Sequence, residues 1–161
     1  NSLNAAGFSA ITTTQADARY ATLSTTQTIT GAKAFTSTVT MAGTATFTGS
    51  VQVSTAVNVN TVTLTDAASI TSSFDAGNTF VVTLGGNRTL AAPTSAGIGQ
   101  TGSIRVIQDA TGGRTLSYNS AWQFVSASAP VMDTSAGAQS ILVFSCRSAT
   151  TIDAVMLHDF K

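Results

Sequence analysis

The chain has 161 residues, which suits one compact domain or a small domain joined to an extended segment. Charged residues make up only 9 % of it and the formal net charge is zero, so the composition offers no electrostatic basis for binding nucleic acid or a membrane surface. No apolar run approaches the ~18 residues of a membrane span, which predicts no membrane insertion.

Hydroxyl side chains supply most of the polar residues, with 29 Thr and 19 Ser. Threonine is β-branched and fits a pleated sheet, whereas Glu and Lys are poor strand formers. The chain contains no Glu and only two Lys, so surface helices are difficult to build from it. This composition predicts an all-β protein.

Residues 1–34 are polar and show little periodicity. Within them, residues 14–21 could form a short helix that Thr14 caps. An isolated helix of this length is marginal without packing against other elements.

Within residues 35–65, the odd positions from Phe35 to Val59 carry the apolar residues, and the even positions carry Thr, Ser, Gln, Asn and Ala. Such alternation is typical of β-strands. A second period of six residues is superimposed, and its units begin at Ser37, Gly43, Gly49 and Thr55. This repeat predicts short strands separated by bends, with the apolar phase slipping by one residue after residue 61.

Four hexads are too few for one chain to bury their apolar side, because a single-chain hexapeptide β-helix uses about three repeats for each turn. Three chains wound about a shared axis could bury it, so we expect an intertwined trimeric stalk that resembles a triple β-helix. Its core would contain Phe35, Val39, Met41, Phe47, Val51, Val53, Val57 and Val59. The alternative is a long hairpin that turns at Gly43 or Gly49, but the apolar phase continues through both glycines.

Residues 66–161 are expected to form a C-terminal β-sandwich or jelly-roll-like domain. Strands are predicted at residues 79–84, 103–108, 114–118, 139–147 and 151–158, with a turn at residues 109–113. The predicted core consists of Trp122, Phe124, Phe144, Leu142, Ile104 and Val106.

Motifs that carry chemistry are weak. The glycines of residues 97–102 match a dinucleotide fingerprint, but a strand-like run follows them where that motif requires a helix. His158 is the only histidine, the seven Asp are scattered, and Cys146 has no partner for an intramolecular disulfide and is expected to be buried. We therefore expect no catalytic, metal or cofactor site.

Tyr118, Asn119 and Trp122 form the best candidate ligand site, because exposed aromatic rings beside an amide can stack on a sugar ring. The alternative is that Trp122 packs in the core. Three arginines in or next to predicted strands, Arg105, Arg114 and Arg147, could bind anionic sugars, although such residues more often form surface or intersubunit ion pairs.

Two segments resemble proteins of tailed-phage fibres. Residues 16–20 read Ala-Asp-Ala-Arg-Tyr and are followed by Thr-Ile-Thr-Gly-Ala-Lys-Ala-Phe at residues 28–35, a combination similar to that of phage fibre chains. Residues 87–90 and 115–118 also resemble parts of domains found on phage tail or head fibres. The resemblance implies a homotrimeric virion fibre whose amino end attaches to the particle.

The expected function is therefore structural and adhesive, without an enzymatic activity. Residues 1–34 would attach to other virion proteins, residues 35–65 would form the stalk, and residues 66–161 would face the host and contact its surface polysaccharide from the virion surface. Alternatives are a head fibre or capsid decoration without a receptor role, an isolated carbohydrate-binding module, and a polysaccharide depolymerase.

Overall fold

A computed structural model describes residues 38–160 of the chain. The expected helix at residues 14–21, the attachment segment 1–34 and Phe35 lie outside the described residues. The chain divides into two compact units, Asn1–Val51 and Gln52–Lys161.

The hexad segment, defined here as residues 38–60, contains no strand. Its backbone bends at residues 42–43, 48–49 and 54–55, which are six residues apart. The bends predicted at Gly43, Gly49 and Thr55 are therefore confirmed, whereas the short strands predicted between them are absent from the single chain. The large apolar side chains of the segment are exposed by 48–70 %: Val39, Met41, Phe47, Val51, Val53, Val57 and Val59. In the single chain, the large apolar side chains of the described part of this repeat are thus open to solvent.

The C-terminal domain, residues 61–160, is a β domain without an α-helix among its described residues. Its nine strands are β1 (Thr61–Thr63), β2 (Ser69–Ile70), β3 (Thr79–Leu84), β4 (Arg88–Leu90), β5 (Thr101–Gln108), β6 (Leu116–Tyr118), β7 (Trp122–Phe124), β8 (Gln139–Ser148) and β9 (Thr151–Phe160). The all-β prediction is confirmed, and β3 has the predicted bounds.

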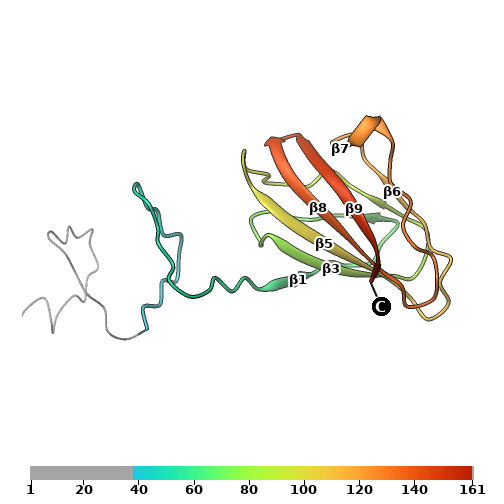
Figure 1. Ribbon diagram of the computed structural model, residues 1–161, viewed down its shortest axis with the longest axis horizontal. Coiled ribbons are helices and arrows are strands. Elements are labelled where there is room, and N and C mark those ends of the chain that lie inside the picture. Colours follow the sequence, from blue (N-terminus) through green and yellow to red (C-terminus); the bar gives the residue numbers. More distant parts are fainter. Residues whose placement is uncertain (1–37, 161) are drawn as a thin grey trace, which may run out of the picture. The chain divides into compact units, whose positions relative to one another are not determined.

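Two sheets share these strands. One sheet has the order β1-β3-β5-β8-β9-β7, and the other has the order β2-β4-β6. Figure 1 shows β3, β5, β8 and β9 side by side. Successive strands from β1 to β6 alternate between the sheets, so β1, β3 and β5 pair in parallel, as do β2, β4 and β6.

This pairing corrects the jelly-roll prediction. A jelly roll consists of antiparallel Greek keys. Here the chain coils between the two sheets three times before β8 and β9 add an antiparallel pair to the larger sheet. Neighbouring strands of one sheet are connected through a strand of the other sheet. The chain therefore enters the first sheet again in the same direction, and the two neighbours pair in parallel.

One apolar core lies between the sheets. Phe80, Ile104, Leu142 and Met156 occupy one cross-strand row on the inner face of the larger sheet and are all buried. An aromatic cluster lies in the same core, where Phe74 stacks on Phe144 at a ring separation of 4.5 Å. Of the predicted core residues only Phe124 is half-buried, and the others are buried.

Polar side chains organise the loops around this core. The amide of Gln108 is fully buried and donates to the carbonyl oxygens of Arg114 and Asp133 while it accepts from the Arg114 N–H. Asp109 accepts from the backbone N–H groups of Thr111 and Gly112, which forms the turn predicted at residues 109–113. The hydrogen bonds of Gln108 thus connect the beginning and the end of the long segment between β5 and β8, at Arg114 and Asp133.

Candidate functional site

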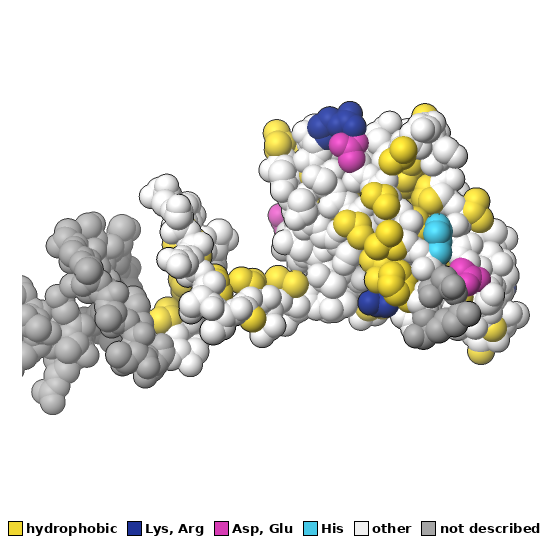
Figure 2. Space-filling model, in the orientation of Figure 1, with side chains coloured by type: hydrophobic (Ala, Val, Ile, Leu, Met, Phe, Trp, Pro, Cys, Tyr) yellow, Lys and Arg dark blue, Asp and Glu magenta, His cyan; other side chains and the backbone are white. Residues whose placement is uncertain are grey.

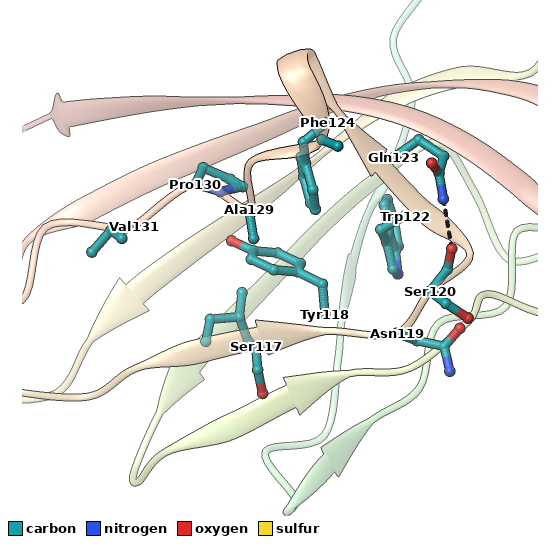
Figure 3. A pocket seen from close by; sticks show the side chains of 12 residues that line it. Ser117, Tyr118, Asn119, Ser120, Trp122, Gln123, Phe124, Ala129, Pro130 and Val131 are labelled. Atoms are coloured by element: carbon teal, nitrogen blue, oxygen red, sulfur yellow. Dashed lines mark hydrogen bonds between the residues drawn. The ribbon is translucent and has the colours of Figure 1, made fainter.

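A groove of about 540 Å³ opens at the end of β6 and is closed on its other side by β7 and the segment that follows it. It includes all three residues of the predicted ligand site: Tyr118, Asn119 and Trp122. Figure 3 shows the rings of Tyr118 and Phe124 pointing toward each other from opposite walls, with Ala129 and Pro130 beside them. The three residues that the sequence analysis selected therefore line this groove together.

A tight turn connects the two walls. Asn119 accepts through its side-chain oxygen from the Ala121 N–H at 2.9 Å, and its backbone carbonyl accepts from the Trp122 N–H at 3.0 Å. The side chain of Gln123 donates to the carbonyl oxygen of Ser120 at 2.7 Å. These bonds fix the turn, so the amide groups lie at a preformed rim and the aromatic rings lie deeper.

Trp122 is not an exposed stacking platform. Only 3 % of its surface is exposed, and its indole N–H donates to the carbonyl oxygen of Ala91 at 2.8 Å. It therefore takes the core position that the sequence left open as the alternative. Phe124, two residues later, is half-buried and supplies the second aromatic ring of the groove. The sequence predicts Phe124 in the core, and the structure instead leaves it partly exposed, packed against the core and lining the groove.

The hydroxyl of Tyr118 is buried and has no hydrogen-bond partner among the described residues. Its ring meets Phe124 edge to face, with centroids 4.6 Å apart. Burial raises the pKa of Tyr118 to about 12, because the phenolate would lose its hydration. A buried polar atom without a partner is costly, so a ligand hydroxyl that reached it would find an unused donor and acceptor.

The segment beyond β7 carries local strain. Ser126 and Ala127 have φ of 57° and 55°, in the left-handed region that L residues seldom occupy. Each such residue costs roughly 1–2 kcal/mol. They belong to η2 (Val125–Ala127), a short 3-10 turn, and Ala127 lines the groove. Strained backbone often accompanies binding sites, and here it shapes one wall.

None of the twelve side chains that line the groove is charged. It can therefore offer stacking and neutral hydrogen bonds, but it holds no carboxylate, imidazole or thiol for proton transfer or metal binding. Elsewhere in the described residues, no cluster of three or more His, Cys, Asp and Glu side chains is close enough to hold a metal ion. Cys146 is buried in β8, and burial raises the pKa of its thiol.

Within residues 38–160, three arginines form ion pairs with carboxylates: Arg88 with Asp66, Arg114 with Asp109, and Arg147 with Asp153. Two of the arginines proposed for anionic sugars, Arg114 and Arg147, are thus occupied within the chain. Arg105 donates instead to the side-chain oxygen of Gln139 at 2.9 Å. The glycine-rich stretch at residues 97–102 forms a turn and then enters β5, so it lacks the helix of a dinucleotide site.

Nothing among the described residues resembles a membrane-spanning helix. The chain is an all-β protein in which a six-residue repeat leads into a two-sheet domain with an uncharged groove. Residues 68–147, from just before β2 nearly to the end of β8, match the family described as "Putative phage tail fibre C-terminal domain". The chain is accordingly a bacteriophage tail fibre protein.

This membership gives the protein a structural role in the tail fibre and makes it a component of the virion that associates with other virion proteins. No curated protein and no solved structure matches the chain.

Proposed function

We propose that three copies of this chain form a segment of the tail fibre, with their hexad segments wound about a common axis. The observation that carries this proposal is the exposure of every large apolar side chain between Val39 and Val59 in the single chain. The bends repeat with the same six-residue period, so the apolar residues recur at equivalent points along the segment. Burial of such surface is worth roughly 25 cal/mol per Å², and no other described part of the chain supplies it here.

The C-terminal domain is the adsorption module in this proposal, and its role is binding rather than catalysis. Its uncharged groove combines aromatic rings with amide side chains, which suits a neutral sugar of the host surface. A trimer would present three such grooves, so that a repeated polysaccharide is held by avidity even if each groove binds weakly. Residues 1–34 would attach the fibre to neighbouring virion proteins.

Light scattering on the full chain tests the stoichiometry. We expect three times the chain mass of 16.3 kDa, and a monomer mass would contradict the trimer. Binding of the purified protein to host cells tests adsorption separately. If wild type neither binds cells nor competes with the phage, the protein is a structural segment or a decoration without a receptor role.

A pair of variants tests the groove itself. Val131 lines the groove and is 81 % exposed, whereas Ile98 is 82 % exposed and lies outside it. Val131→Asp should weaken cell binding while Ile98→Asp leaves it unchanged, because only the first places a charge beside the sugar. Equal binding by both variants would show that another surface makes the contact.

A further inference from the structure

The outer face of the six-stranded sheet carries apolar side chains on β3, β5, β8 and β9. Side chains that point inward from β3, β5, β8 and β9 form the core, and those between them point outward. Four of the outward apolar side chains are 38–47 % exposed. We define the outer apolar face as Val81, Ile107, Ile141, Val143, Val155, Leu157 and Phe160.

Strand register makes this face continuous across β8 and β9, whereas Arg105 on β5 separates Val81 from Ile141. Val81, Arg105, Ile141 and Leu157 lie in one cross-strand row, and Val143 lies opposite Val155 in the next. Residues directly opposite on neighbouring strands have Cβ atoms about 4.5–5.5 Å apart, close enough for their side chains to touch. Figure 2 shows a band of hydrophobic side chains over the strands that Figure 1 labels β8 and β9.

The middle parts of β8 and β9 have the composition of strands that are buried on both sides. Residues 141–144 read Ile-Leu-Val-Phe and residues 154–157 read Ala-Val-Met-Leu, without the polar alternation of a sheet that faces water. The inner residues of both runs are buried in the core, so core packing does not account for the outer ones. Apolar patches of about this size are often functional, so the face is a candidate contact surface.

The area of the face argues against a separate binding partner. Strands lie about 4.8 Å apart and alternate residues about 6.8 Å apart, so seven residues over four strands span only a few hundred Å². A stable, independent complex buries about 800 Å² on each partner. The face is therefore suited to a contact between molecules that something else already holds together.

The hexad segment can hold them together, because it runs directly into β1, a strand of this same sheet. Where three hexad segments share an axis, the chain delivers three copies of the sheet to neighbouring positions. Linkage then raises their effective concentration and makes a small apolar contact sufficient.

The charge on the face also suits contact between copies. Among the described side chains in these rows, Arg105 is the charged one, and it lies toward β3 rather than β9. Arg147 and Asp153, toward the other end of the face, neutralise each other. If β8 and β9 lie nearest the axis, the Arg105 side chains of the three copies lie away from it. The three identical faces then repel one another only weakly.

We propose that the outer apolar face is the surface through which the C-terminal domains of three copies pack against one another, with β8 and β9 nearest the fibre axis. This inference rests on the trimer of the proposed function. It assigns the groove at Tyr118 and the outer apolar face to different tasks, one toward the host and one toward sister chains.

Thiol labelling of the full chain tests the inference. Val155→Cys places a thiol of similar size on the face, and Ile98→Cys places one at an exposed loop position. Wild type supplies the background, because Cys146 is buried. In a protein with a trimer mass by light scattering, maleimide should modify Val155→Cys at least about tenfold more slowly than Ile98→Cys, since a covered thiol is inaccessible. Val143→Cys should behave as Val155→Cys does and replaces it if that variant does not fold.

Each other outcome overturns the inference in a distinguishable way. A trimer whose Val155→Cys thiol reacts as fast as that of Ile98→Cys leaves the proposed function intact and refutes this interface. A monomer with fast labelling at both positions refutes the trimer and the interface together. A monomer in which Val155→Cys is protected shows that the chain covers the face with its own residues.

Discussion

The hexad segment and the C-terminal domain use the same alternation of apolar and polar residues, but they differ in what covers the apolar side. Phe80 and Leu142 are completely buried within the domain, because loops return the chain so that one sheet covers the other. Val51 and Val57 are 59 % and 70 % exposed, because the chain bends every six residues without forming a strand pair there. Alternation therefore predicts which side of a strand is apolar, but not whether the same chain covers it.

The largest expected effect comes from a charge in the hexad segment. Val51→Asp would place three carboxylates near the proposed axis, and burial of each costs several kcal/mol. We expect the mass by light scattering to fall from three chains to one, while the melting of the C-terminal domain, followed by Trp122 fluorescence, is preserved. Gln52→Asp is the matched control on the polar side. A trimer that survives Val51→Asp would show that this residue is not buried between chains.

The complementary change weakens the domain and leaves the repeat intact. Phe144→Ala removes a ring that is stacked on Phe74 and buried in the core. Such truncations cost about 3–5 kcal/mol of unfolding free energy. Urea unfolding followed by Trp122 fluorescence should show this loss, and Val125→Ala, at an exposed position, should lie within about 0.5 kcal/mol of wild type. A loss below 1 kcal/mol would mean that the aromatic cluster is loosely packed.

A glycine substitution tests how closely the domain packs. A Cβ at Gly102 would lie 2.0 Å from the carbonyl oxygen of Asn78 and 2.6 Å from the ring of Phe144. Gly102→Ala must shift the backbone, and overpacking of this kind costs about 1–3 kcal/mol or more. Gly97→Ala, where the nearest atom is 3.8 Å away, is the control and should melt like wild type. Equal melting temperatures for both variants would contradict the close approach of β5 to Asn78.

A smaller effect of opposite sign is expected at Tyr118. Its hydroxyl is buried without a partner, so Tyr118→Phe should raise the unfolding free energy by about 1 kcal/mol. The pKa of Tyr118 is raised to about 12 in the folded chain, whereas in the unfolded chain it has its ordinary value of 10.0. The unfolded chain therefore releases this proton first, so the free energy of unfolding of wild type is unaffected below pH 10 and falls as the pH rises toward 12. Urea titrations at pH 7 and at alkaline pH measure both effects. A variant with an unchanged alkaline loss would assign that loss to another group.

The smallest expected effect is acid sensitivity at the Asp66–Arg88 pair. The hydrogen bonds from Arg88 hold the pKa of the Asp66 carboxyl below its ordinary value of 3.8. The stabilisation is present above that value and is lost as the pH falls through the lowered pKa. The pair is exposed, so Asp66→Asn should slightly reduce the difference in melting temperature between pH 7 and pH 3, more at low salt than at high salt. An unchanged difference would show that the pair contributes nothing measurable.

The strands that were predicted correctly from the sequence are those long enough to show an alternation of apolar and polar residues. Residues 79–84 were predicted as they occur in β3, and β5, β8 and β9 extend only one or two residues beyond the predicted ranges. The short strands β1, β2, β4 and β7 have two or three residues each, so no period can reveal them. They exist because of pairing with strands distant in the sequence, and the parallel arrangement depends on the same pairing.

The groove shows the same limit. Tyr118 and Asn119 could be selected from residue type and proximity alone. The burial of Trp122 depends on the carbonyl of Ala91, which lies 31 residues away in the chain, and the role of Phe124 depends on the fold of the segment after β7. Local sequence therefore identified Tyr118 and Asn119, whereas the positions of Trp122 and Phe124 in the groove are set by tertiary contacts.

The order of the strands has a consequence for biosynthesis. Among the described strands, only β8 and β9 are joined by a two-residue connection, Ala149 and Thr150, which makes their hairpin the most rapidly formed pairing in the domain. This hairpin also emerges from the ribosome after the other strands. The parallel pairs that precede it close slowly because each joins residues far apart in the chain. The domain is thus expected to complete its fold only once β9 has been synthesised.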